Sequence, residues 1–330
     1  MSCPAKYATL NDNYSFMEVN YMNSPIDEYY VDNADSLIEV YKTVTKEDPF
    51  LGLKDVFLRG VPDSSFKLVP SIDRPGNERI LQYEDEAIRE ALKQFPETIL
   101  GTDKSAIADT ITEYCNRHNI KKSNDLNQVG ERAEIEEEIL RNHALRFSTN
   151  IIGRGDIALG DIAILQHYGF PTRLLDITTD LKVAVFFACQ DCYDNSVKNG
   201  LIYVFESSLT CSLKQIDSTQ PYHEFINEQS PFAFRLKRPF FRDECQCGDF
   251  IFVPDKHPAT SMGKHTLVPL NESDLVIAKI IVDASAKRSI LKEFSANPCS
   301  SVNYKTIYAD GVEGCFRAVA QAFRAGEKLW

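Results

Sequence analysis

The sequence contains no apolar run long enough to cross a membrane. A transmembrane helix takes about 20 predominantly apolar residues, and no stretch of the 330 residues approaches that length. The first residues also lack a basic segment followed by an apolar one, so no signal peptide is apparent. The sequence therefore predicts a cytoplasmic protein without membrane contact.

An excess of positive charge is missing as well. The chain carries 36 basic and 48 acidic side chains, which gives a net charge of −12. Proteins whose main role is to coat nucleic acid need a basic surface that displaces counterions from the phosphates. That role is disfavoured for this chain, although a local basic cleft is compatible with the composition.

No disulfide framework or metal motif is recognisable. The nine cysteines are odd in number and irregularly spaced, which is not typical of a secreted disulfide-rich domain. The pairs Cys189-x-x-Cys192 and Cys245-x-Cys247 lack the spacing and the glycines usual in zinc knuckles, so we expect no metal site. Phosphate-binding loops, dinucleotide-binding glycine fingerprints and zinc-protease helices are absent too.

The residues that are present favour an α+β protein. Apolar residues make up 43% of the chain and charged residues 25%, as in ordinary globular proteins. Apolar spacing predicts helices at 33–47, 84–95, 105–118, 131–147, 155–169, 178–192, 286–294 and 311–323. Strands are predicted at 55–62, 171–177, 200–207 and 274–285, with strands and turns in 231–254.

The order of these elements suggests one large domain with an insertion. Residues 1–34 are polar and weakly patterned, so we expect an N-terminal arm, with residues 35–330 forming the domain. The helices of about 84–150 would be an insertion between the first strand and the other strands. Three helix ends carry signals: Asn33 or Asp35 as the first cap, Gly169 as a C-cap, and Thr178 or Thr179 as the cap of the 178–192 helix.

The segment LQHYGFPTRLLDITTDLKVAVFFAC, residues 165–189, places two charged side chains in an apolar run. Arg173 and Asp176 are three positions apart in an extended stretch, so they point to opposite faces and each needs its own partner. In the structural alternative, Asp176 caps the following helix and Arg173 pairs with another acid. In the functional alternative, both face a ligand cleft.

Several segments together resemble the FRG domain family of bacteria and phages. They are FLRG (57–60), FKLVPSIDR (66–74), a helix with acidic residues and Phe95, LQHYGFPTRLLDITTDLKVAVFFA (165–188), and QCGDFIF (246–252). The resemblance spans roughly residues 35–325. Two positions depart from the family pattern: Ile177 stands where the family usually has Trp, and Cys247 where it often has a second Gln.

A weaker resemblance connects the order of these segments with ADP-ribosyltransferases. It implies a mixed or antiparallel sheet of that type, NAD as the substrate, and a macromolecular acceptor, either protein or nucleic acid. The protein would be a toxin or anti-phage effector, with a neutralising antitoxin protein as a further partner. The alternative is a non-catalytic module that binds a nucleotide or a protein.

The resemblance also assigns roles to individual residues. Arg59, Arg173, Asp176 and Gln246 would be catalytic, and NAD would contact Arg59, Gly60, Ser71, Arg74, Tyr168, Thr172 and Thr178. The planar fork of Arg59 suits phosphate, and Gly60 would let nicotinamide approach the backbone. Without the resemblance, the sequence also allows Arg59 to form a surface salt bridge and Tyr168 to pack in the core.

The same resemblance implies that Gln246 stands where ADP-ribosyltransferases place a catalytic Glu or Gln. A glutamine can orient a ribose, but it supplies less charge to an oxocarbenium-like transition state, unless Glu244 or Asp176 provides that charge. If the assignment holds, Arg59, Arg173 and Gln246 converge on one cleft.

Overall fold

The computed structural model describes residues 26–45, 56–100, 156–167, 169–192, 197–206, 208–209, 212–237, 246–256 and 265–296. The predicted helices at 105–118, 131–147 and 311–323 lie outside the described residues. So does most of the predicted insertion, of which only the first helix is described.

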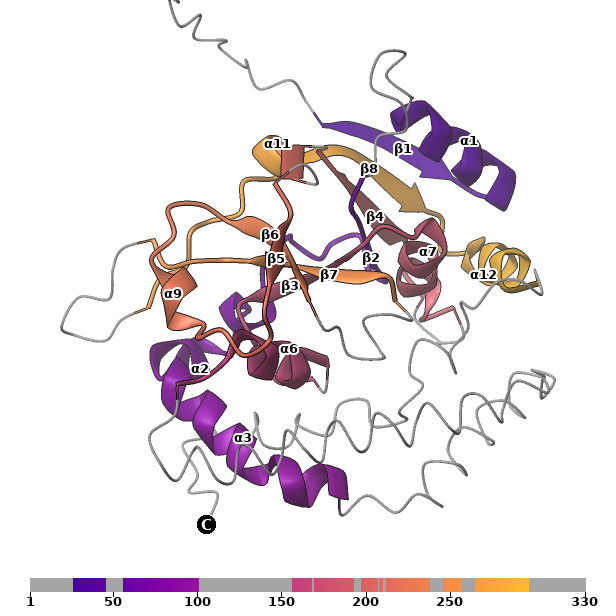
Figure 1. Cartoon of the computed structure of the whole chain (residues 1–330). Helices are drawn as coiled ribbons and strands as arrows, with labels where there is room; N and C mark the ends of the chain where they lie inside the picture. Colours follow the sequence, from indigo (N-terminus) through magenta and orange to yellow (C-terminus); the bar gives the residue numbers. More distant parts are fainter. Residues whose placement is uncertain are drawn as a thin grey trace, which may run out of the picture.

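A single eight-stranded mixed sheet runs through the molecule (Figure 1). Its order is β1-β8-β4-β2-β3-β7-β6-β5. The outermost pairs β1/β8 and β5/β6 are parallel, and the other neighbours are antiparallel. The strands are β1 (Asp27–Val31), β2 (Leu58–Val61), β3 (Leu174–Thr178), β4 (Gly200–Phe205), β5 (Lys214–Ile216), β6 (Phe232–Leu236), β7 (Gly248–Phe252) and β8 (Val276–Val282). The predicted α+β class with a mixed sheet is confirmed.

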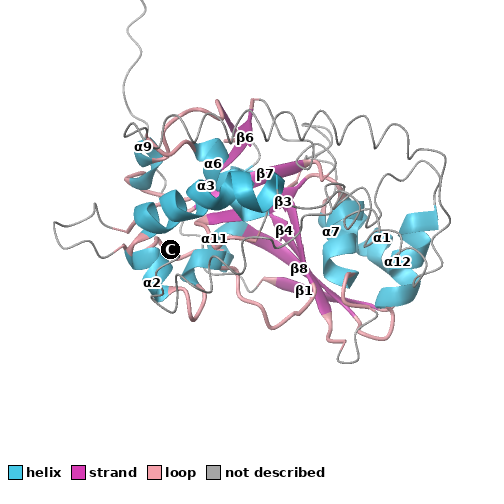
Figure 2. Ribbon diagram, turned by 90° about the horizontal axis from the view of Figure 1, so that it is seen from below, coloured by secondary structure: helices cyan, strands magenta, loops and turns pink. Residues whose placement is uncertain are grey.

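Helices cover the sheet in two groups (Figure 2). One group contains α1 (Ala34–Val44), α7 (Leu181–Cys189) and α12 (Lys287–Ala296). The other contains α2 (Glu78–Gln82), α3 (Glu84–Leu100), α6 (Leu159–His167) and α9 (His223–Ile226), and the short η1 (Ser71–Asp73) and α11 (Glu272–Leu275) complete the set. Within the described ranges, no helix combines the length and the apolar character that a bilayer span requires.

Strand β4 shows how the sheet separates two cores. All six of its residues are buried, as its uninterrupted apolar sequence GLIYVF predicts for a strand covered on both faces. Successive side chains point to opposite faces, so Tyr203 and Phe205 join one core cluster while Ile202 and Val204 join the other. The second cluster is the one that α1, α7 and α12 cover.

Two helix ends follow the predicted signals and one does not. Asn33 caps α1, where its side chain accepts a hydrogen bond from the Ser36 amide at 2.8 Å. Gly169 follows α6 with a φ of 86°, the left-handed conformation that suits glycine. The cap of α7 is Asp180, which accepts from the Lys182 amide at 2.8 Å. The predicted Thr178 is still part of β3, so the extended segment lasts longer than expected.

The predicted N-terminal arm also needs correction. Residues 27–31 form β1, which pairs with β8 along its whole length. The sequence does not reveal this strand because it lies at the edge of the sheet and buries only Val31, while Tyr30 is 73% exposed. An edge strand needs no regular alternation of apolar residues.

Helix α7 lies unusually close to the sheet at two glycines. A Cβ atom on Gly60 of β2 would lie 1.9 Å from the carbonyl oxygen of Ala184, and one on Gly200 of β4 would lie 2.2 Å from that of Ala188. Both alanines are fully buried, so the small residues on the two elements face each other. This contact gives Gly60 a packing role, whereas the sequence had suggested access for a ligand.

We expect the variant Gly60→Ala to lower the free energy of unfolding by about 3 kcal/mol or more, because the new methyl group collides with the helix backbone. The matched change is Gly76→Ala. Gly76 has a φ of 90° and nothing within 4 Å of the added Cβ, so only backbone strain of about 1–2 kcal/mol is expected there. Urea unfolding of both variants measures the difference, and equal losses would contradict the close contact.

Candidate functional site

The sheet opens between β2 and β3. Strand β2 pairs with β4 at four positions and β3 with β7 at five, but β2 and β3 pair only at Leu58 and Thr178. A pocket of about 360 Å³ lies at this opening, a volume within the range of about 300–1,000 Å³ typical of small-molecule sites. Polar side chains in its lining are those of Arg59, Arg74, Asp176, Thr178, Gln190 and Gln246.

Arg59 bridges the two strands where their backbones no longer pair. Its side chain is 13% exposed, and Nη1 donates to the backbone carbonyl of Asp176 at 2.6 Å. The same nitrogen is 3.6 Å from Asp176 Oδ2. Among the described residues, Nε and Nη2 of Arg59 have no hydrogen-bond partner. Part of this guanidinium is therefore available to a ligand.

Arg74, which directly follows η1, brings a second guanidinium to the pocket. Partial removal from water and repulsion by Arg59 lower the pKa of Arg74, and Asp176 partly opposes this shift. Within the described part of the chain, the Arg74 side chain forms no ion pair. The charged side chains that the described residues bring to the lining are two cations and one carboxylate, a balance that favours an anionic ligand.

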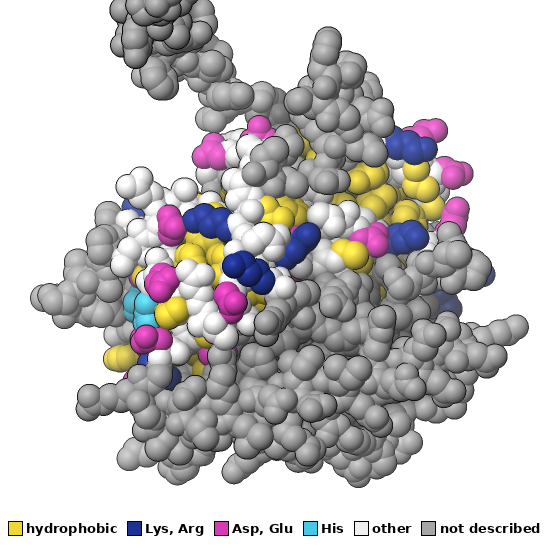
Figure 3. All heavy atoms as spheres, in the orientation of Figure 1, with side chains coloured by type: hydrophobic (Ala, Val, Ile, Leu, Met, Phe, Trp, Pro, Cys, Tyr) yellow, Lys and Arg dark blue, Asp and Glu magenta, His cyan; other side chains and the backbone are white. Residues whose placement is uncertain are grey.

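This balance differs from the charge of the chain as a whole. On the face shown in Figure 3, basic and acidic side chains are interspersed among hydrophobic ones. The chain as a whole has a net charge of −12. A local positive excess inside a pocket of such a protein is the kind of basic cleft that the composition left open.

The predicted residues Thr178 and Gln246 meet at the pocket, although they are 68 positions apart. Thr178 Oγ1 donates to the backbone carbonyl of Gln246 at 2.7 Å and accepts from the Asp180 amide at 3.0 Å. Its hydroxyl thus connects the end of β3 with the residues before β7. Gln246 lines the same pocket as Arg59 and Asp176.

Hydrogen bonds connect Ser71 and Thr172 beside the pocket. The sequence had predicted that both residues contact a ligand. Ser71 Oγ accepts from the Thr172 amide at 2.9 Å, and the Ile72 amide donates to the Thr172 carbonyl at 3.0 Å. Thr172 is fully buried, and neither residue is part of the pocket lining. Together they hold η1 against the segment that leads into β3.

Gln166 of α6 has no predicted role, yet it connects this pair with the pocket. Its Oε1 accepts from Thr172 Oγ1 at 2.5 Å and Ser71 Oγ at 3.4 Å, and its Nε2 donates to Asp176 Oδ2 at 3.1 Å. The only signal in the sequence is its place directly before His167 in the 165–189 block.

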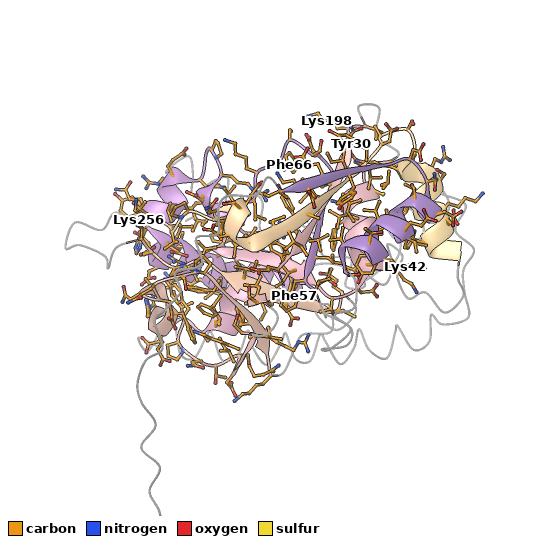
Figure 4. The ribbon with its side chains drawn as sticks, turned by 90° about the horizontal axis from the view of Figure 1, so that it is seen from above. Tyr30, Lys42, Phe57, Phe66, Lys198 and Lys256 are labelled. Carbon is orange, nitrogen blue, oxygen red and sulfur yellow. The ribbon has the colours of Figure 1, made fainter. Side chains whose placement is uncertain are left out.

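Phe66 is a second residue that the sequence left unnoticed. It lines the pocket and is 45% exposed, whereas Phe57, labelled with it in Figure 4, is fully buried. Tyr203 Oη donates to the Phe66 carbonyl at 2.9 Å and so anchors its loop. A large aromatic ring in a polar, serine-containing loop was the available signal.

Arg173 lies apart from this pocket. It is fully buried, donates from Nε to Glu84 Oε1 at 2.9 Å and from Nη1 to the Val253 carbonyl at 3.1 Å, and Asp255 is 3.4 Å away. Its Nη2 donates to Glu84 Oε2. Burial acts to lower the pKa of Arg173, but the two carboxylates outweigh it and raise the pKa.

A histidine extends the same cluster. His265 Nδ1 lies 2.7 Å from Asp255 Oδ2, and this hydrogen bond raises the pKa of His265. The expectation that Arg173 shares a cleft with Arg59 and Gln246 is therefore corrected: these contacts match the structural alternative, in which Arg173 pairs with acids. The physical reason is that Arg173 and Asp176 face opposite sides of the extended segment.

Three predicted positions, Tyr168, Glu244 and Cys245, lie outside the described residues. For zinc, the described ranges contain no group of three or more His, Cys, Asp or Glu side chains that could hold a metal ion. Cys189 and Cys192 are free thiols, and burial raises the pKa of Cys189 to about 12 and that of Cys192 to about 11.

Comparison with known proteins identifies one family. The family model of the FRG domain matches residues 115–196, which include Gln166, Arg173 and Asp176. No curated protein and no solved structure matches the chain.

The buried cluster predicts a large loss of stability on removal of its cation. Arg173→Leu leaves the buried Glu84 without its cation and Asp255 with His265 alone, so the free energy of unfolding should fall by about 3–5 kcal/mol. Lys198→Met removes a cation that is 62% exposed from its pair with Asp63, whose Oδ1 still accepts two hydrogen bonds from Ser65, and should cost about 1 kcal/mol or less. Chemical unfolding of both variants checks this, and a mild effect of Arg173→Leu would show that the cluster is dispensable.

Proposed function

We propose that the pocket between β2 and β3 binds NAD and that the protein transfers its ADP-ribose to a macromolecule. The observation that carries the proposal is the incomplete pairing of Arg59 and Arg74 beside one carboxylate. Guanidinium groups bind phosphate through paired, charge-assisted hydrogen bonds. A diphosphate supplies the negative charge that this lining lacks.

The other lining residues suit the remaining parts of a dinucleotide. The exposed ring of Phe66 can stack on a planar base, a role that the sequence had assigned to Tyr168. Asp176 and Gln246 offer oxygen atoms to ribose hydroxyls. Arg59 and Arg74 would hold the phosphates between these two regions.

The reaction would break one bond and form another at the same carbon. As the bond between the ribose C1′ and the nicotinamide nitrogen breaks, nicotinamide leaves with the electron pair. An oxygen or nitrogen of the acceptor then bonds to C1′, and the proton of the acceptor passes to a base or to water. The ribose becomes oxocarbenium-like in the transition state, which a nearby carboxylate such as Asp176 stabilises.

One feature of the lining favours a non-catalytic nucleotide-binding module instead. Gln246 has an uncharged side chain where a transferase of this kind would use an acid. Among the described residues, Asp176 is the only carboxylate in the lining, and its charge is partly offset by Arg59 at 3.6 Å. Such a site would hold a nucleotide firmly and cleave it slowly or not at all.

The proposal also covers the biological role of the enzyme and its partners. By its resemblance to ADP-ribosyltransferases, the protein would be a toxin or anti-phage effector that acts in the cytoplasm, where NAD is available. The acceptor would be a protein or a nucleic acid. Uncontrolled modification would harm the host, so a neutralising antitoxin protein would accompany it.

Calorimetric titration with NAD, together with release of labelled nicotinamide in a cell lysate, tests the proposal. Arg59→Ala should weaken NAD binding by about tenfold or more, because it removes a charge-assisted contact with phosphate. Arg79→Ala removes the same charge on α2, outside the pocket lining, and should bind NAD like the wild type. If the wild type neither binds nor consumes NAD, the proposal fails.

The variant Gln246→Glu separates catalysis from binding. A carboxylate at this position stabilises the developing positive charge on the ribose, so nicotinamide release should be preserved or increased while NAD affinity changes less. Gln82→Glu adds the same charge on the exposed face of α2 and should leave the rate unchanged. Binding without nicotinamide release in every variant would support the non-catalytic module.

A further inference from the structure

The orientation of the Gln166 amide follows from its hydrogen bonds. Ser71 Oγ accepts from the Thr172 amide, and Thr172 Oγ1 accepts from the Leu174 amide. Thr172 Oγ1 can therefore direct its proton to Gln166 Oε1 at 2.5 Å, whereas Ser71 Oγ can donate either to the Thr172 carbonyl at 3.2 Å or to Gln166 Oε1 at 3.4 Å. This arrangement leaves the amide nitrogen to face the Leu174 carbonyl at 3.2 Å and Asp176 Oδ2 at 3.1 Å.

The Asp176 carboxylate keeps unused capacity to accept hydrogen bonds. Its side chain as a whole is 42% exposed at the pocket, and Oδ1, which is itself buried, has no hydrogen-bond partner among the described residues. Arg59 donates to the Asp176 backbone carbonyl and remains 3.6 Å from the carboxylate. An ionised carboxylate offers about four acceptor positions, and here Gln166 provides the one side-chain hydrogen bond that the described residues make to it.

We propose that Asp176 accepts a hydrogen bond from a hydroxyl of the nicotinamide ribose and that Gln166 is the positioning residue that turns its carboxylate to the pocket. This inference rests on the proposed binding of NAD. A carboxylate repels phosphate but accepts hydrogen bonds from hydroxyl groups. Asp176 would therefore bind the ribose, while Arg59 and Arg74 bind the phosphates. The pocket would consequently select a ligand whose ribose hydroxyls are free and intact.

Nothing in this role requires Gln166 to touch the ligand. Its two acceptor contacts reach Ser71 and Thr172, which join η1 to the start of β3, while its donor contacts reach β3 itself. The orientation of the Asp176 carboxylate thus depends on how α6, η1 and the start of β3 are positioned relative to one another. Changing it should alter selectivity among ligands, which a purely structural role would leave constant in the folded protein.

Calorimetric titration of the full chain compares NAD with two analogues that lack the 2′- or the 3′-hydroxyl of the nicotinamide ribose. At least one analogue should bind the wild type about 10–100-fold more weakly, the range expected for a hydrogen bond to a charged group. If both analogues bind within about threefold of NAD, the inference is overturned while NAD binding stands. If NAD itself does not bind, both proposals fall.

Variants of Asp176 and Gln166 test which residues cause the preference for NAD over the analogues. Asp176→Ala should reduce the preference for NAD over the weaker analogue to about threefold or less, and Asp176→Asn should reduce it in part, because a neutral acceptor forms a weaker hydrogen bond. Gln166→Glu keeps an acceptor for Ser71 and Thr172 but turns a negative charge toward Asp176, so it should also reduce the preference.

The matched change Gln82→Glu should retain the wild-type preference. If Gln166→Glu unfolds the protein, Gln166→Met removes the contact without adding charge, and the same loss of preference is expected. Wild-type preference in a folded Gln166 variant, together with its loss in Asp176→Ala, would refute the positioning role of Gln166.

Discussion

The arrangement of the whole site depends on one break in the hydrogen bonding of the sheet. Strands β2 and β3 are neighbours that pair at a single position, whereas their outer neighbours remain paired at several. A sheet that opens in this way exposes backbone groups that need partners. The Arg59 guanidinium supplies one by donating to the Asp176 carbonyl, and α7 contacts both strands from one side.

The close packing of α7 against the sheet fixes the position of one wall of this opening. Gly60 and Gly200 allow the backbone of α7 to approach two adjacent strands, β2 and β4. The same helix contributes Val183, Phe187 and Gln190 to the pocket lining. Packing and ligand access are therefore linked, because a shift of α7 would change one wall of the pocket.

Two arginines show how burial decides the role of a charged side chain. Arg173 is fully enclosed, and a buried charge is tolerated only with counter-charges and hydrogen bonds, which Glu84, Asp255 and the Val253 carbonyl provide. Arg59 lies at the edge of a pocket and keeps donors unused within the described residues. Arg173 holds α3 and the end of β7 together, whereas Arg59 has hydrogen-bond donors that a ligand could use.

Local patterns in the sequence determined most of the elements that the structure describes. The apolar run of β4, the Asn33 cap and the Gly169 turn could be predicted because each depends on neighbouring residues. Strand β1 and the Asp180 cap could not, because an edge strand and the last residue of β3 are defined by pairing with distant strands. The periodicity of the 165–189 block correctly placed Arg173 and Asp176 on opposite faces, but only the tertiary structure decided what each face meets. Arg59 and Asp176 are 117 positions apart, and strand order, which no local pattern encodes, brings them together.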